Sequence, residues 1–377
     1  MLARPTCVHS SSSHEHIERL GYRPELNGLR ALSVLAVAVF HTNLGILQGG
    51  WLGVDLFFVL SGFLITTLLL EERDENGIRL GAFYARRALR LLPALAALLG
   101  FLMLLVTVGA ASSSTTRDVP WVLSYIANWR PAVGGGRGPL THLWSLSVEE
   151  QFYVVWPLVL VGLLRASVPA RRLVIGLAGV AGTIAIVRTG LFIAHVITPE
   201  RAYFGSDVRA DALLAGCLLA VVRHAGWASH IERYVRTLLW PAVAGLVVIA
   251  FVHASPFART GPLLFGPVDG AALVVVAGLV LFPHRFRALR WRPLVELGKL
   301  SYAFYLWHVP VMVVFGMSPV LRLVLGLPLT LVASIASRFL VEQPMLRWKR
   351  RFERTTAAGG DDGARTASTE SLVVAPA

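Results

Sequence analysis

The most regular feature of the sequence is a series of apolar runs separated by glycine, proline or charged residues. Each run is about long enough to cross the ~30 Å hydrocarbon core of a bilayer as a helix. The long alternating pattern of a β-barrel is missing from the sequence. The pattern predicts an all-α, polytopic transmembrane helical bundle with about ten spans, at residues 29–48, 51–70, 91–110, 143–164, 173–196, 208–223, 238–254, 267–283, 301–317 and 320–340.

Composition supports the same class of protein. Of the 377 residues, 55% are hydrophobic and 15% are charged, and the mean hydropathy is +0.64. A soluble domain of this length cannot bury that much apolar surface around one core, so the lipid bilayer is an expected partner. The net charge of +13 is attributed to arginine-rich cytoplasmic loops, and no nucleic acid is expected as a partner.

The distribution of basic residues between alternate connections predicts the orientation of the chain. One set of connections, which includes both termini, is rich in arginine. The opposite set is poor in arginine and contains only Arg117, Arg130, Arg137, Arg201, Arg259 and Arg322. Because basic loops stay in the cytoplasm, both termini are predicted to be cytoplasmic.

The chain divides into a long membrane domain and two polar tails. Residues 1–21 are predicted to be a disordered cytoplasmic tail, residues 22–348 the transmembrane domain, and residues 349–377 a basic stretch followed by a disordered cytoplasmic tail. The longest outer connection, about residues 111–141, contains a glycine run at residues 134–136, and this run is expected to be a flexible loop. Two distant cysteines and the absence of metal-binding motifs predict no bound metal or cofactor.

Polar residues inside the first three spans are the first candidate site residues, because charge at membrane depth is costly. Arg30 and His41 are eleven residues apart on one predicted helix, roughly 16 Å at ~1.5 Å per residue. Arg87 and Arg90, spaced i and i+3 just before the third span, can contact one anion together. Pro93 follows them and is expected in the first turn of that helix. The second span contains Asp55 and Ser61.

Later spans add a second group of candidates. Glu149 and Glu150 open the fourth span, and His308 lies in the ninth.

Each candidate also has a structural interpretation. The glutamates can pair with Arg188 or Arg209, and Arg209 and Asp211 can form an interfacial ion pair, which we favour. Arg87 and Arg90 can be cytoplasmic anchors, Ser61 and Gly62 a close packing point, and each histidine an interhelical hydrogen-bond partner.

Taken together, the candidates describe a reaction across the membrane. Arg30, Arg87 and Arg90 suit a phosphate-bearing ligand from the cytoplasm. His41 offers a general base, whose imidazole Glu149 or Glu150 would orient. A phosphate-binding site on one side of the membrane and a general base partway across it indicate acyl transfer from a CoA thioester to a hydroxyl. His41 would activate the hydroxyl or carry the acyl group itself. A proton-coupled transporter uses the same residue types.

Several segments resemble the acyltransferase-3 family of bacterial membrane O-acyltransferases. The first is LNGLRAL at residues 26–32, followed by His41 with the family's spacing from Arg30. The second is GVDLFFVLSGFLI at residues 53–65. Arg87 and Arg90 match an Arg-x-x-Arg motif. Further similar segments are residues 144–153 (WSLSVEEQFY), 209–214 and 298–308. The resemblance spans about residues 22–348.

The resemblance implies a ten-helix acyltransferase domain in the bacterial inner membrane. It would transfer an acyl group, usually acetyl, from cytoplasmic acyl-CoA to a carbohydrate-containing acceptor. His41 would be the principal catalytic residue, with Glu149 and Glu150 beside it, and Arg30, Arg87 and Arg90 would bind the donor. Asp55, Ser61, Asp211 and His308 would be second-tier site residues.

Two departures from the family pattern bear on these expectations. Asn27 stands where the family often has aspartate, so the charge of that position is missing. The chain also ends in a short polar tail where some relatives carry an extracytoplasmic hydrolase-like domain. It is therefore expected to transfer the acyl group directly or to a separate extracytoplasmic transferase or glycan-assembly partner. The alternatives are a transporter or flippase of a glycolipid or acylated product, and a non-catalytic membrane partner of a glycan-assembly complex.

Overall fold

A computed structural model describes residues 19–252, 255–314 and 316–345. Within these residues the chain forms helices and no strand, as the sequence predicts. The tail predicted at residues 349–377, and all but the last three residues of the tail predicted at 1–21, lie outside the described residues.

A long helix or helical segment overlaps each of the ten predicted spans. They are α1 (Pro24–His41), α2 (Leu52–Asn76), α3 (Leu80–Thr107), α6 (Trp144–Arg165), α7 (Ala170–Ile193), α9 (Ser206–His224), α10 (Ala228–Phe251), α11 (Gly261–Leu281), α13 (Ser301–Val314) and the run α14 (Pro319–Leu321), η3 (Arg322–Gly326), α15 (Leu327–Ser337) and η4 (Arg338–Glu342), in which η3 and η4 are π-helical.

Seven of these segments are long and apolar enough to cross a membrane. The three that are not are α1, which begins with polar residues, α9, which carries four charged residues, and α13, which has only 14 residues. A helical membrane bundle is therefore confirmed, whereas the count of ten spans stays a prediction.

Short helices occupy the connections between the long ones. They are α4 (Ser114–Leu123), α5 (Trp129–Ala132), η1 (Thr141–Leu143), α8 (Pro199–Phe204), η2 (Pro283–Arg290) and α12 (Arg292–Lys299). Two of them, α4 and α5, lie within the long outer connection, where residues such as Val122, Pro131 and Ala132 are buried against the rest of the domain and this packing stabilises short helices. The glycine run at residues 134–136 follows α5 and lies outside any helix.

The third long helix begins earlier than the sequence predicts. It starts at Leu80, so Arg87, Arg90 and Pro93 all lie inside α3 and Pro93 is not in its first turn. The stretch before the apolar run is rich in alanine, leucine and arginine, which favour helix. The helix therefore continues through the proline, and both arginines project from regular helical backbone.

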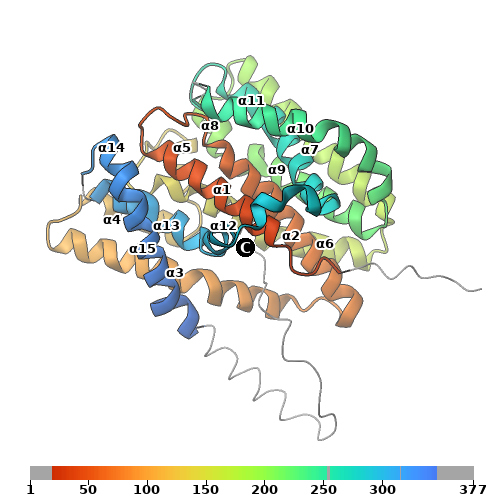
Figure 1. The fold of residues 1–377 in the computed structure, drawn as a ribbon, viewed down its shortest axis with the longest axis horizontal. Coiled ribbons are helices and arrows are strands. Elements are labelled where there is room, and N and C mark those ends of the chain that lie inside the picture. Colours follow the sequence, from red (N-terminus) through yellow and green to blue (C-terminus); the bar gives the residue numbers. More distant parts are fainter. Residues whose placement is uncertain (1–18, 253–254, 315, 346–377) are drawn as a thin grey trace, which may run out of the picture.

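The second helix is the most buried of the seven spans. In its most apolar window 83% of the residues are buried, compared with 17% in α7 and 22% in α10. Figure 1 shows α1 and α2 between α7, α10 and α11 on one side and α3, α13 and α15 on the other. Large apolar side chains such as Ile186 and Leu340 remain exposed on the outer helices, as expected of a surface that faces lipid. The two innermost helices, α1 and α2, carry Arg30, His41, Asp55 and Ser61 of the candidate site residues.

The crossing of α2 and α9 depends on two glycines. A Cβ atom on Gly62 would collide with the backbone carbonyl of Leu213, and one on Gly216 would collide with the carbonyl of Val59. Small residues that let backbones approach are the usual contact of membrane helices. The sequence interpretation of Gly62 as a packing point is therefore confirmed.

We expect Gly216→Ala to lower the free energy of unfolding by about 1–3 kcal/mol, because the added methyl group forces the two backbones apart. Thermal unfolding of the detergent-purified protein, followed by circular dichroism, measures the effect. Gly182→Ala in α7 is the matched control, because a Cβ there meets open space. An equal loss in both variants would contradict the close crossing.

Candidate active site

Three histidines from three helical segments meet at the end of α1. His41 is the last residue of α1, His308 lies in α13, and His142 lies in η1. The ring centroids of His41 and His308 are 4.9 Å apart, and those of His142 and His308 are 5.3 Å apart. His308 Nε2 lies 3.2 Å from His41 Nδ1. The structure therefore brings together His41 and His308, which are 267 positions apart in the sequence.

Hydrogen bonds to backbone carbonyls define which ring nitrogen carries a proton. His41 Nδ1 lies 2.8 Å from the carbonyl oxygen of Val37, and His308 Nδ1 lies 2.6 Å from that of Tyr305. A carbonyl only accepts, so in the neutral rings both Nδ1 atoms are donors. His308 Nε2 then accepts a second, shared bond from His41 Nδ1. This pattern leaves His41 Nε2 without a proton, which is the form that acts as a general base.

A polar support behind the histidines involves residues that the sequence did not single out. The hydroxyls of Tyr305 and Ser145 are 2.7 Å apart, and the Tyr305 hydroxyl donates to the carbonyl of His142. These bonds connect α13 to η1 and the start of α6. Ser145 and Tyr305 both lie in segments that resemble the family, but a sequence pattern does not show that two such segments touch.

A second cluster gathers arginines and glutamates around α1, α3 and α6. Arg87 Nε donates to both carboxylate oxygens of Glu150, at 3.0 and 3.1 Å, and its guanidinium lies 3.4 Å from the ring centroid of Tyr153. Arg90 interacts electrostatically with Arg30 and Arg87. The three predicted donor-binding arginines are thus grouped in the fold.

Arg30 has a neutral partner at this cluster. Its Nε and one Nη donate to the hydroxyl of Ser301, at 3.1 and 2.9 Å, and the residue is 6% exposed. The nearest contact of Glu149 is the hydroxyl of Ser61, which donates to it at 2.7 Å. Since the charge of Arg30 is not cancelled by a carboxylate in direct contact, this guanidinium is the best placed to meet an anionic group of a ligand.

The expected pairing of His41 with a glutamate does not occur in the structure. Glu150 pairs with Arg87 and Glu149 with Ser61, whereas His41 is oriented by His308. The reason is the position of each residue along its helix. The start of α6 lies beside Tyr305, level with the histidines, and the glutamates follow one to two turns later, beside the arginines. The suggested pairs of Glu149 and Glu150 with Arg188 or Arg209 are also wrong.

Asp55 and Asp211 belong to a third group, a buried ion network of five residues. Asp55 pairs with Arg209, and Asp211 pairs with Arg188 at 2.8 Å. Asp269 lies 3.6 Å from Arg188 and 3.8 Å from Arg209 and joins the two pairs. None of the five is more than 5% exposed. The favoured sequence interpretation, an interfacial Arg209–Asp211 pair, is therefore wrong, because each of the two has a different partner at the core.

Asp269 is a network member that sequence reasoning missed. A signal was present, since Asp269 is a lone carboxylate within the apolar run of α11, and charge at that depth indicates a partner. The network ties α2, α7, α9 and α11 together. Its Asp55 and Asp211 hold the helices around the site rather than joining the histidine or arginine clusters.

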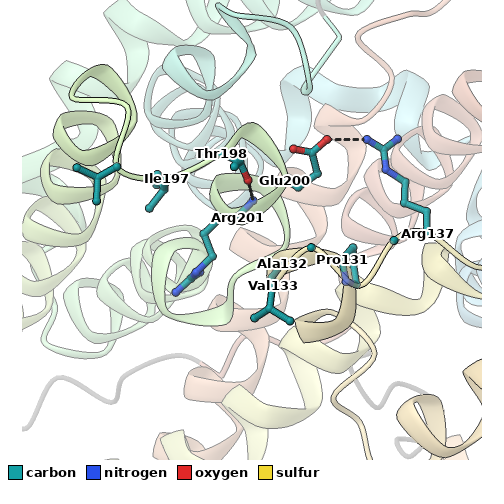
Figure 2. Close-up of a pocket in the computed structure, with 11 residues that line it drawn as sticks. Pro131, Ala132, Val133, Arg137, Ile197, Thr198, Glu200 and Arg201 are labelled. Carbon is teal, nitrogen blue, oxygen red and sulfur yellow. Dashed lines mark hydrogen bonds and ion pairs between the residues drawn. The ribbon is translucent and has the colours of Figure 1, made fainter.

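A pocket of about 810 Å³ opens between α5 and α8. Figure 2 shows Arg137 and Glu200 facing each other across it as an ion pair, and Thr198 joined to the backbone of Arg201. In the part of the chain that the structure describes, no three His, Cys, Asp or Glu side chains are placed to hold a metal ion.

Comparison with known proteins identifies the family. The profile of the acyltransferase domain of the acyltransferase-3 family matches residues 23–340. This chain belongs to the acyltransferase-3 family. It thus contains the acyltransferase domain of a membrane-embedded family, as the motifs around Arg30, His41 and Arg87 predicted. No solved structure matches this acyltransferase.

Three curated relatives resemble the acyltransferase over most of its length. The peptidoglycan O-acetyltransferase OatA of Listeria monocytogenes is 32% identical over 87% of the chain and 55% of the relative. The putative peptidoglycan O-acetyltransferase YrhL of Bacillus subtilis is 33% identical over 89% and 56%. The O-acetyltransferase OatA of Staphylococcus aureus is 34% identical over 86% and 57%. The acyltransferase thus spans little more than half the length of these relatives.

Proposed function

We propose that this acyltransferase transfers an acetyl group from cytoplasmic acetyl-CoA to a hydroxyl of a carbohydrate, with peptidoglycan glycan as the favoured acceptor. The observation that carries the proposal is the arrangement along α1. Arg30 lies in an arginine cluster near one end, and His41, with an unprotonated Nε2, closes the other. Eleven residues of helix separate them by about 16 Å. The names of the relatives support acetyl as the group and peptidoglycan as the acceptor.

The arginine cluster is proposed as the donor end of the site, facing the cytoplasm. Arg30 and Arg90 would contact the phosphates of acetyl-CoA. Arg87 would donate hydrogen bonds both to Glu150 and to a phosphate of the ligand. The pantetheine arm would then extend along α1 and present the thioester to His41. Because the loop charges predict the arginine end to be cytoplasmic, this direction carries the acetyl group from the cytoplasm outward.

The chemistry proposed at His41 is general base catalysis. Nε2 takes the proton of the acceptor hydroxyl while its oxygen attacks the thioester carbonyl carbon. The C–S bond then breaks, and the imidazolium returns the proton to the departing CoA thiolate, so the products are an O-acetyl ester and the CoA thiol. When the ring becomes positive, its Nδ1–H bonds to Val37 and His308 strengthen. The alternative, in which His41 itself carries the acetyl group, predicts an acetylated imidazole.

The experiment is a transfer assay with the purified protein, isotopically labelled acetyl-CoA and soluble peptidoglycan fragments released by muramidase. An alkali-labile labelled acetyl ester on the fragments supports the proposal. Hydrolysis of the labelled acetyl-CoA, or labelled acetyl on the protein, without an ester on the glycan would indicate that a separate extracytoplasmic transferase or glycan-assembly partner completes the reaction. Movement of a glycolipid without any covalent change would instead support the transporter alternative.

His308 is proposed as a positioning residue for His41. Replacing it by alanine removes the acceptor of the Nδ1–H bond, so the ring loses its fixed orientation and tautomer, and kcat is expected to fall about 100-fold. His308→Gln keeps an acceptor oxygen near the same point and is expected to recover part of this loss. The measurement is kcat and KM for acetyl-CoA with each variant.

A merely structural role for His308 predicts a different pattern. Both variants would then lose folded protein in parallel and keep the kcat of the folded fraction. The active fraction is therefore determined by size-exclusion chromatography before each assay. Equal kcat for the alanine and glutamine variants and the wild type would contradict the positioning role.

A further inference from the structure

The pocket between α5 and α8 has a lining that none of the catalytic clusters uses. One wall consists of Pro131, Ala132 and the glycine-rich loop after α5, and the other consists of Val196, Ile197 and the start of α8. Both walls lie in connections that the loop charges predict to be extracytoplasmic. With about 810 Å³, the pocket is within the size range of small-molecule sites. Its position suits a substrate that arrives from outside the cell.

The charges of the lining are balanced. Arg137 lies 3.1 Å from Glu200, and Arg201 makes two hydrogen bonds to Asp207, at 2.9 and 2.6 Å. Asp207 is not part of the lining, but it pairs with Arg201 from the start of α9. Both lining guanidiniums therefore have a carboxylate partner, and the pocket has no unpaired guanidinium for a phosphate or for acyl-CoA. It offers both N–H donors and carboxylate or hydroxyl acceptors, among them Thr198, which suits a neutral ligand rich in hydroxyls.

Aromatic rings hold the arginines of the pocket in place. The guanidinium of Arg137 lies 3.7 Å from the ring centroid of Phe257, and that of Arg201 lies 5.0 Å from the ring of Trp129. A stacked guanidinium keeps its N–H edge in a fixed direction. The Arg137–Glu200 pair is half exposed, and ion pairs in contact with solvent are weak, so a hydroxyl can replace one of its contacts at little cost.

A continuous set of contacts leads from the pocket to the histidines. Two residues after Arg201, the buried ring of Tyr203 packs against Trp144, with 4.6 Å between the centroids. On the pocket side, the ring of Tyr203 lies 5.1 Å from that of Phe257, which contacts Arg137. On the other side, Ser145 follows Trp144 in the chain, and its hydroxyl lies 2.7 Å from that of Tyr305. Tyr305 in turn holds the backbone of His142 and lies one turn from His308. A row of packed aromatic residues therefore links the pocket to the catalytic cluster.

We propose that this pocket binds a sugar unit of the acceptor glycan and so determines which saccharide receives the acetyl group. The proposal rests on the proposed function, because it assigns the acceptor end of the same reaction. Arg137 and Glu200 would bind neighbouring hydroxyls of the sugar, and Thr198 would contribute a further hydroxyl contact. The acceptor glycan would then extend from the pocket towards His41.

The test measures binding separately from turnover, with the full-length protein in lipid nanodiscs. The probe is the muramidase-released peptidoglycan disaccharide without O-acetyl groups, and its affinity is determined by saturation-transfer NMR. Val133→Trp fills the pocket from an exposed position, and Arg137→Gln removes one guanidinium. Both are expected to weaken binding of the disaccharide at least about tenfold, equivalent to about 1.4 kcal/mol. Arg117→Gln, on an exposed face of α4 outside the pocket, is the matched control and should bind like the wild type.

Affinity for acetyl-CoA, measured in the same samples, is expected to stay unchanged in all three variants. A disaccharide affinity that is unchanged in both pocket variants would overturn the proposal, and so would a wild type that does not bind the disaccharide. A parallel loss of acetyl-CoA affinity would assign the pocket to the donor and also overturn it. The protein could also bind the disaccharide through Arg137 and yet form no ester. That result would support the pocket as a saccharide site and overturn only the proposed function.

Discussion

His41→Ala is expected to lower kcat for acetyl transfer by about 10²–10⁴-fold, the range by which a positioned general base accelerates a reaction. The reason is that Nε2 of His41 is the one ring nitrogen of the His41–His308 pair that the hydrogen bonds leave unprotonated and outside the pair. The variant keeps Arg30 and the rest of the arginine cluster, so its affinity for acetyl-CoA should remain close to that of the wild type. Turnover of labelled acetyl-CoA into glycan ester measures the effect.

The matched control for this prediction is His230→Ala. His230 is an exposed histidine in the first turn of α10 and belongs to none of the clusters around α1. The control should keep wild-type kcat and the same elution volume in size-exclusion chromatography. A correctly folded His41→Ala protein with near-wild-type kcat would contradict general base catalysis by this residue.

Asp55→Ala is expected to produce the largest loss of stability, about 3–5 kcal/mol, because it leaves the buried guanidinium of Arg209 without its closest carboxylate. The remaining carboxylate near Arg209 is Asp269, at 3.8 Å, and Arg188 shares it. Removing both charges with Asp55→Ala and Arg209→Met is expected to recover part of the loss, since the guanidinium is removed together with its partner and Asp269 still has Arg188 at 3.6 Å.

Thermal unfolding of the single and double variants in one detergent forms a double-mutant cycle that measures the coupling. Asp74→Ala, at the exposed end of the same helix, is the control. The carboxylate of Asp74 lies 3.5 Å from His224 and is 50% exposed, so its loss is expected to change the stability by no more than about 1 kcal/mol. A double variant as unstable as the sum of the two single variants would show that Asp55 and Arg209 do not act as a pair.

The sequence predicts the helices of this protein well because each apolar run has to satisfy its own backbone inside lipid. The positions of Arg30 and His41 on one helix follow from the same local pattern, and so does the shared face of Arg87 and Arg90. Errors occur where the helix is not apolar. The start of α3 at Leu80 precedes the apolar run, and α4 and α5 are short helices stabilised by packing rather than by their own hydrophobic pattern.

The partners of the polar residues were not predictable from the sequence in the same way. Arg209 is 154 positions from Asp55, and its own near neighbour Asp211 proved to pair with another helix. From the sequence, the glutamates could be assigned equally well to His41 or to an arginine. The position of a residue along its own helix does not determine which residue of a neighbouring helix lies at the same depth in the membrane. The choice depends on how α6 lies against α1 and α13, which a single sequence does not display.

The acetyl group is proposed to enter at the arginine cluster and to leave as an ester made at His41. The most direct measurement uses proteoliposomes with oriented protein, labelled acetyl-CoA on the arginine side only, and peptidoglycan fragments on the opposite side only. We expect labelled O-acetyl ester on the enclosed fragments with the wild type and about 10²–10⁴-fold less with His41→Ala. Ester that forms only when donor and fragments share one side, or that forms equally with His41→Ala, would contradict this proposal.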